Sequence, residues 1–204
     1  MLTIALTGGI ACGKTTVSAM LRALGASIID ADEISRSLTA ANGAALPLIR
    51  ESFGDQVFHP DGTLDRPALS KAVFGNPEAL AALNAITHPL IEREMLAQLA
   101  DCRENGAEVV VLDVPLLFEA NMQHMGDLTA CVTVPEETQI ARLFTRNGFD
   151  REMALARIRS QMPVSEKAAR SDVVINADQP LQALEETVRK LYEGWLLAAR
   201  KENA

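Results

Sequence analysis

The chain has 204 residues, of which 48% are hydrophobic and 23% charged, and its net charge is −8 at pH 7. This length is sufficient to bury a core and favours one domain with an insertion or two. The acidic balance argues against a general nucleic-acid binder, which needs a basic face for phosphates, and no apolar stretch approaches the ~20 residues that a membrane span requires.

The first predicted strand, Leu2–Leu6, starts one residue after the initial Met. No basic leader or cleavage region precedes it, so we expect a cytoplasmic protein. A helix over residues 17–24 should follow, because apolar side chains recur there at i, i+3, i+4 and i+7, and Gly25 is a suitable terminator.

Between that strand and that helix stands Gly8-Gly9-Ile10-Ala11-Cys12-Gly13-Lys14-Thr15, which satisfies G-x-x-x-x-G-K-[ST] in full. Glycines let the backbone curl so that successive N–H groups converge on phosphate oxygens at the positive end of the helix. Lys14 would supply charge to the β- and γ-phosphates, Thr15 a hydroxyl to Mg²⁺, and Thr16 a contact to the α-phosphate. A chance glycine-rich turn is the alternative, but both flanks of the motif favour a phosphate-binding loop.

The cysteines Cys12, Cys102 and Cys131 are odd in number and lack the spacing of a metal site or a redox pair. This pattern argues against a disulfide scaffold and fits the reduced cytosol. Cys12 would stand at a helix N-terminus, where the pKa of a thiol tends to fall. The hypothesis that follows is that oxidants inactivate the protein unless ATP is bound.

Further short apolar runs predict four more strands, which are Ser27–Asp30, Val109–Asp113, Cys131–Val134 and Val173–Ile175. Strands that are apolar on both faces and alternate with helical patterns indicate an α/β fold with a parallel five-stranded sheet flanked by helices. We expect a nucleotide-binding core made of residues 1–32, 109–135 and 169–204. Residues 33–108 would form a helical insertion, and residues 136–168 a second helical segment.

Two acidic sites follow predicted strands. Asp30-Ala31-Asp32 begins at the last residue of the second strand, at the sheet edge where ligands of open α/β folds collect. Asp32 is the candidate general base, with Asp30 as a helper, although either side chain could instead cap the next helix. Asp113 ends the third strand, where it could orient Mg²⁺ or simply begin a turn.

Residues 136–170 carry seven Arg and Lys against five Asp and Glu, so this segment is mildly basic in an acidic protein. Arg142 and Arg146 are four residues apart and share a face of the predicted helix. Arginines on a mobile segment can close over ATP and stabilise charge on the transferred phosphoryl group. A solvated helical face rich in ion pairs is the structural alternative.

The residues favour a P-loop kinase with a small acceptor. A GTPase would carry Asp-x-x-Gly where Val114-Pro115-Leu116 follows Asp113, and Asn-Lys-x-Asp is absent. Another nucleoside, nucleotide or shikimate kinase remains an alternative. A nucleotide-binding regulator without catalysis is a second one, disfavoured by intact Lys14, Thr15 and Asp32.

Taken together, these segments resemble the dephospho-coenzyme A kinase family over nearly the whole chain. The motifs that carry the resemblance, in chain order, are Leu6–Ile10, Gly13–Thr16, Asp30–Asp32 with Ile34 and Arg36, Ile86–Pro89, Asp113–Glu119, Gln139, Arg142, Arg146, Arg157, Gln161, Lys167, Ala169 and Val174–Asn176.

The resemblance implies transfer of the ATP γ-phosphate to the ribose 3′-hydroxyl of dephospho-coenzyme A, the last step of coenzyme A synthesis, with ATP and Mg²⁺ as cofactors. The insertion would bind the acceptor, and residues 136–168 would form a lid. The expected partners are small molecules, with no nucleic acid and no membrane, in a monomer or weak homo-oligomer. The implied catalytic residues are Lys14, Asp32 and Arg142; the ATP-binding residues are Gly9, Ile10, Ala11, Cys12, Gly13, Lys14, Thr15, Thr16, Arg142, Arg146 and Asn176; the acceptor-binding residues are Asp32, Arg36, His88, Pro115, Leu117 and Phe118; and the metal ligands are Thr15 and Asp113.

The chain departs from the family's pattern in two places. Ala11-Cys12 stands where Gly-Ser is common, so Ala11 must adopt its conformation without glycine's freedom. Arg146-Asn147-Gly148 lacks the acid that commonly follows the arginine, which puts the role of Arg146 in question.

Overall fold

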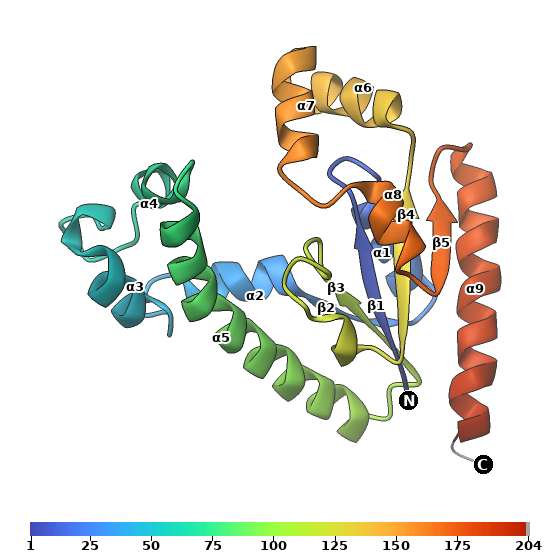
Figure 1. Ribbon diagram of the computed structural model, residues 1–204. Coiled ribbons are helices and arrows are strands. Elements are labelled where there is room, and N and C mark those ends of the chain that lie inside the picture. The colour runs from blue at the N-terminus through green and yellow to red at the C-terminus, as the bar shows by residue number, and fades with distance from the viewer. Residues whose placement is uncertain (203–204) are drawn as a thin grey trace. The chain divides into compact units, whose positions relative to one another are not determined.

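The computed structural model of the protein describes residues 1–202. Five parallel strands form one sheet (Figure 1). In spatial order they are β2 (Ser27–Asp30), β3 (Val109–Asp113), β1 (Leu2–Gly8), β4 (Leu128–Thr133) and β5 (Val173–Asn176). Every residue of β1 and of β3 is buried, as expected for parallel strands covered on both faces.

The expected α/β class and all five strands are confirmed, but the bounds of three strands differ from the sequence prediction. β1 continues to Gly8 and β5 to Asn176, and β4 begins three residues before Cys131. The local apolar run places the start of β4 at Cys131. The strand begins earlier because Leu128 already pairs with Ile4 of β1, and that pairing is not visible in the local pattern.

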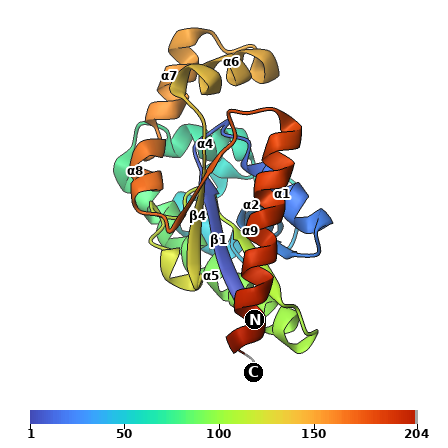
Figure 2. The ribbon, with the colours of Figure 1, turned by 90° about the vertical axis from the view of Figure 1, so that its right-hand side faces the viewer.

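Helices cover both faces of the sheet. In Figure 2, α1 (Lys14–Ala23) and α9 (Leu181–Glu202) lie on one side of β1 and β4, and α8 (Val164–Ala169) lies on the other. The stripe of α9 that packs into the core consists of Leu184, Val188, Tyr192 and Trp195. Leu181, the first residue of the helix, is exposed.

Between β4 and α8 the chain forms α6 (Glu136–Asn147) and α7 (Arg151–Arg159), beyond the carboxyl ends of the strands (Figure 1). Gly148, in the left-handed region with φ 68°, ends α6, and Asp150 caps α7 by accepting from the Met153 N–H. Ile140, Leu143 and Ala154 form a small separate core between the two helices.

The chain divides into two compact units, residues 1–30 with 99–204, and residues 31–98. The second unit contains α2 (Ala31–Leu38), α3 (Leu46–Phe53), the 3-10 helix η1 (Asp55–Val57), α4 (Arg66–Val73) and most of α5 (Pro77–Glu104), whose last turns belong to the first unit. A short 3-10 helix, η2 (Gln123–Met125), precedes β4.

The second unit has a core of its own, centred on Ala45, Ile49, Val57 and Leu69. Its α4 begins at Asp65, whose carboxylate accepts from the Ala68 N–H. None of the helices in residues 1–202 is long and apolar enough to cross a membrane.

Candidate active site

The phosphate loop joins the end of β1 to the start of α1, as its motif predicts. Gly13 precedes the helix with φ 92°, a left-handed conformation that favours glycine, and it offers no side-chain cap. The Thr16 N–H donates to the Gly13 carbonyl oxygen at 3.0 Å. The N–H groups of Lys14 and Thr15, the first two residues of α1, have no intrahelical acceptor and are oriented for an anion. The side chains of Thr15 and Thr16 in this turn are exposed, and the loop can therefore present both N–H groups and hydroxyls to a polyphosphate.

Lys14 and Asp113 form an ion pair at the end of the sheet. The pairing follows from the topology, since β3 lies beside β1 and Leu6 is in register with Asp113. Asp113 is only 4% exposed, so the position expected for a metal-side acid holds a buried carboxylate next to the loop lysine. Asp30 ends β2 in register with Asp113, which places a second acid at the same edge.

Arg142 extends from α6 to the phosphate loop. Its two terminal nitrogens donate to the carbonyl oxygens of Ala11, at 3.2 Å, and Ala177, at 3.0 Å. One of them would lie 3.3 Å from a Cβ added to Gly13. The guanidinium therefore spans the gap between the loop and the segment after β5, and brings positive charge to the loop.

Arg146 is not brought to the loop with Arg142. It is exposed, and its Nε donates to the side chain of Asn147 at 2.9 Å. Asn176 ends β5 and is exposed, with its side-chain oxygen accepting from the Asp178 N–H at 2.9 Å. Asn176 thus shapes the turn that carries Ala177.

Two glutamines hold the residue before Ala11. The Ile10 N–H donates to Gln161 Oε1 at 3.0 Å, and the Ile10 carbonyl accepts from Gln139 Nε2 at 2.6 Å. Ala11 then has φ 60°, in the left-handed region that non-glycine residues rarely adopt. Ala11, which stands where the family commonly has glycine, therefore adopts a conformation that glycine would adopt freely, and its backbone is strained.

The segment that follows β3 is held by a buried cation. Lys167 Nζ donates to the Pro115 carbonyl oxygen and pairs with Glu119, both at 2.8 Å, and Thr7 Oγ1 donates to the same carbonyl at 3.0 Å. Two candidate acceptor residues in this segment, Leu117 and Phe118, are buried.

Leu117 and Phe118 therefore pack within the protein. The Arg170 guanidinium lies 4.5 Å from the centroid of the Phe118 ring. Leu116, which was not singled out as a site residue, is the exposed apolar side chain of the segment.

The remaining candidates belong to the second unit. Asp32 and Arg36 lie in the first and last turns of α2. The Arg36 carbonyl oxygen accepts from Arg66 at 3.3 Å. His88 lies within α5 and is half-buried, and burial lowers the pKa of its ring.

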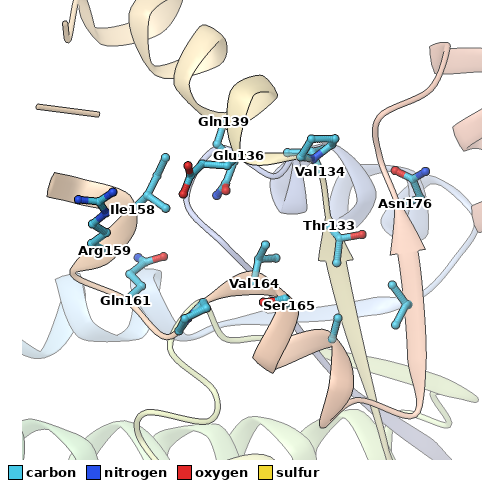
Figure 3. A pocket seen from close by; sticks show the side chains of 14 residues that line it. Thr133, Val134, Glu136, Gln139, Ile158, Arg159, Gln161, Val164, Ser165 and Asn176 are labelled. Atoms are coloured by element: carbon cyan, nitrogen blue, oxygen red, sulfur yellow. The ribbon is translucent and has the colours of Figure 1, made fainter. Parts of the chain in front are cut away.

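A cavity of about 770 Å³ adjoins the first unit's sheet at β4 and β5 (Figure 3). Its walls come from the start of α6, the end of α7, α8 and the edge strand β5. Gln139 and Gln161 line it, and Asn176 is the one predicted site residue among its lining residues. Figure 3 shows these polar side chains around it, together with apolar Val164 and Ile158.

The expectation of a reactive Cys12 thiol is wrong in its physical premise. Cys12 is completely buried, and burial raises the pKa of its thiol against the lowering effect of hydrogen bonds from Val134 and Gly9. The increase in the thiol pKa caused by desolvation is larger than the decrease expected from the helix N-terminus, because the Cys12 side chain lies in the hydrophobic core.

Among residues 1–202 no three His, Cys, Asp or Glu side chains gather as a group that could hold a metal ion. Asp113 and Thr15 nevertheless supply a carboxylate and a hydroxyl close to the loop, and Mg²⁺ at nucleotide sites is commonly bound by one or two protein oxygens together with substrate phosphates. The residues present fit a cation that arrives with the nucleotide.

The roles of Gln139, Gln161 and Lys167 were not predicted, although these residues belong to the motifs that carry the family resemblance. Each acts on a main-chain group more than 50 positions away. Their place in those motifs was the only signal in the sequence that could have pointed to them.

Comparison with known proteins gives one consistent result. Residues 2–183 match the family described as dephospho-CoA kinase. The dephospho-CoA kinase of Carboxydothermus hydrogenoformans is 45% identical over 192 residues, which cover 94% of this chain and 93% of that protein.

Solved structures agree with the sequence comparison. A crystal structure of a Thermus thermophilus protein is similar with a TM-score of 0.81 and 34% identity, covering 95% of this chain and 97% of that one. The dephospho-CoA kinase from Campylobacter jejuni is similar with a TM-score of 0.63 and 25% identity, covering 95% and 96%. With its phosphate loop, its Lys14–Asp113 pair and these relatives, the chain belongs to the dephospho-CoA kinase family.

Proposed function

We propose that the protein transfers the γ-phosphate of ATP to the ribose 3′-hydroxyl of dephospho-CoA, giving CoA and ADP. Family membership over residues 2–183 supports this reaction. The observation that carries the proposal is the Lys14–Asp113 pair at the phosphate loop, with Arg142 reaching the same loop from α6.

On the ATP side, Lys14 and the N–H groups at the start of α1 would bind the β- and γ-phosphates, with Thr16 at the α-phosphate. Arg142 would stabilise negative charge on the transferred group. Thr15 and Asp113 would hold Mg²⁺. When bound, this ion supplies positive charge that neutralises the phosphate oxygens.

On the acceptor side, Asp32 would act as general base. As the 3′-oxygen bonds to the γ-phosphorus, its proton passes to the Asp32 carboxylate, and the bond from that phosphorus to the bridging oxygen breaks to release ADP. The insertion of residues 33–108 would bind dephospho-CoA through Arg36 and His88. Pro115, Leu117 and Phe118 would support the acceptor. Because the side chains of Leu117 and Phe118 are buried, these two residues would do so by packing behind the surface that the acceptor contacts.

The segment of residues 136–168 would act as a lid that excludes water, which protects the γ-phosphate from hydrolysis. Arg146 and Asn176 would contribute to the ATP site at its edge, because both side chains are exposed. A cytoplasmic enzyme that works as a monomer or weak homo-oligomer is consistent with these small-molecule substrates.

The test is ATP- and Mg²⁺-dependent phosphorylation of dephospho-CoA by the wild type, by Asp32→Asn and by Glu33→Gln. Glu33 is the matched control, since it is an exposed acid in the same helical turn. We expect Asp32→Asn to lower kcat by at least about a hundredfold with ATP affinity retained, and Glu33→Gln to leave kcat nearly unchanged.

Product analysis then separates the alternatives. Phosphate on the 3′-oxygen of CoA supports the proposed reaction, whereas turnover with a nucleoside or shikimate but not with dephospho-CoA would replace it with another P-loop kinase activity. Equal activity in wild type and Asp32→Asn would remove Asp32 as the base while leaving the reaction in place.

A further inference from the structure

Both main-chain groups of Ile10 are bound by side chains from the lid segment, residues 136–168. Gln139, on α6, donates to the Ile10 carbonyl at 2.6 Å, and Gln161, between α7 and α8, accepts from the Ile10 N–H at 3.0 Å. Figure 3 shows these two glutamines on different elements of the lid segment. One loop residue is therefore held from both ends of that segment.

The contact at Gln139 is closely packed as well as hydrogen-bonded. Gln139 is 2% exposed, and a Cβ added to Gly9 would lie 2.8 Å from its Nε2. A Cβ at position 9 would therefore require this buried amide to shift. The Gln139 side chain thus packs against the loop backbone at Gly9 and is hydrogen-bonded to it at Ile10.

The loop needs such support because of the residue that follows. Ala11 has φ 60°, which is unfavourable for a residue with a Cβ, and a strained conformation persists only where its surroundings impose it. The Ala11 carbonyl is bound by Arg142, also from α6. Hydrogen bonds on both sides of the Ile10–Ala11 peptide therefore fix the strained turn.

We propose that Gln139 and Gln161 are positioning residues that hold the phosphate loop in its ATP-binding conformation and make that conformation depend on both ends of the lid segment. The inference rests on the proposed function only for its link to catalysis, since ATP binding can be measured without an acceptor. It extends that function by coupling the position of the lid segment to affinity for the nucleotide.

The chemistry of the two contacts gives opposite requirements at the two positions. Position 161 needs an acceptor for an N–H, and a carboxylate supplies one. Position 139 needs a donor for a carbonyl, and a buried carboxylate there would place an oxygen against that carbonyl. Glutamate should therefore be tolerated at 161 and harmful at 139.

The experiment measures the Kd for ATP by calorimetry in Gln161→Glu, Gln161→Met, Gln139→Glu and Gln139→Met. Loss of one hydrogen bond that orders the loop should weaken ATP binding about fivefold to tenfold in both methionine variants and in Gln139→Glu. Gln161→Glu should stay within about twofold of the wild type. Gln182→Met, at an exposed glutamine of α9, is the matched control and should bind ATP as the wild type does.

A rescue variant distinguishes positioning from general stability. Glycine at position 11 adopts the left-handed conformation without the Cβ penalty, so Ala11→Gly combined with Gln161→Met should recover most of the lost ATP affinity. The KM for dephospho-CoA should be unchanged in all of these variants. If Gln139 variants do not fold, the Gln161 pair and its rescue still decide the question.

Three results would overturn the inference: ATP affinity equal to that of the wild type in Gln161→Met, equal losses in Gln161→Glu and Gln161→Met, or no recovery with Ala11→Gly. Failure of the wild type to phosphorylate dephospho-CoA would instead overturn the proposed function, while the ATP-binding results would still test the two glutamines.

Discussion

The ammonium group of Lys167 and the carboxylate of Glu119 form an ion pair of 2.8 Å in which the Lys167 side chain is completely buried. Glu119 also accepts from the Met162 N–H at 3.0 Å, and the same ammonium donates to the Pro115 carbonyl. The ion pair therefore joins the segment after β3 to α8, and the Met162 contact joins it to the segment that leads into α8.

We expect Lys167→Met to lower the free energy of unfolding by about 3 kcal/mol, because it leaves the Glu119 carboxylate without its cation in a largely buried position. Urea titration measures this change. Lys190→Met, at an exposed lysine of α9, is the control and should change stability by less than about 0.5 kcal/mol.

The double variant tests whether the pair itself is responsible. Combining Lys167→Met with Glu119→Gln removes both charges, so the loss of stability should be smaller than the sum of the single losses by about 1 kcal/mol or more. Strict additivity would show that Lys167 acts through packing and its carbonyl contact alone.

The strand before the phosphate loop and the helix after it could be predicted from the sequence, because the loop is a contiguous motif between two locally recognisable elements. The sequence could not predict the Ile10 contacts, since Gln139 and Gln161 lie 129 and 151 positions away and no periodicity links them to the loop.

Helical spacing did not distinguish Arg142 from Arg146, which were expected to act together because they share a face of one helix. Arg142 and Arg146 share the i, i+4 spacing, yet only Arg142 contacts the loop, since Arg146 lies one turn further along α6 and is exposed. A shared face does not imply a shared contact when the helix runs away from the site.

This difference gives a second prediction. Arg142→Ala should lower kcat/KM for ATP by about a hundredfold or more, because the loop loses the charge that we propose stabilises the transferred phosphoryl group. Arg146→Ala should lower it by less than about threefold, since its guanidinium contacts the neighbouring Asn147. Steady-state kinetics with both substrates checks this.

A third variant probes the geometry of the contact. In Arg142→Lys a single ammonium cannot bind the carbonyls of Ala11 and Ala177 together as the planar guanidinium does, so most of the activity should still be lost. Full activity in Arg142→Lys would mean that charge alone is sufficient.

Thiol chemistry supplies a third prediction. Burial raises the pKa of Cys12, and it raises the pKa of Cys131 to about 12, so both thiols should react slowly with iodoacetamide at pH 7.5. Cys102, which is half-buried, should be alkylated first, as peptide mass spectrometry would show. Peroxide should inactivate Cys12→Ser as slowly as the wild type; protection by that substitution would restore the hypothesis of an oxidant-sensitive Cys12.

The fourth prediction concerns pH and His88, whose ring has a pKa lowered by burial from its ordinary value of 6.5. The unfolded chain therefore takes up a proton as the pH falls through about 6.5, while the folded protein takes it up only at lower pH. The neutral ring therefore makes its full contribution to the stability of the folded protein above the pKa of the unfolded chain, about 6.5. This contribution is lost as the pH falls from there through the lower pKa that His88 has in the folded protein.

Between pH 7.5 and pH 5.5 the free energy of unfolding should consequently fall further in the wild type than in His88→Asn, which has no proton to bind there. Urea titrations of both proteins at the two pH values measure the difference, and all other titrating groups cancel in it. An equal fall would show that the ring titrates alike in the folded and unfolded states, and a smaller fall in the wild type would mean that a partner in the folded protein stabilises the charged ring.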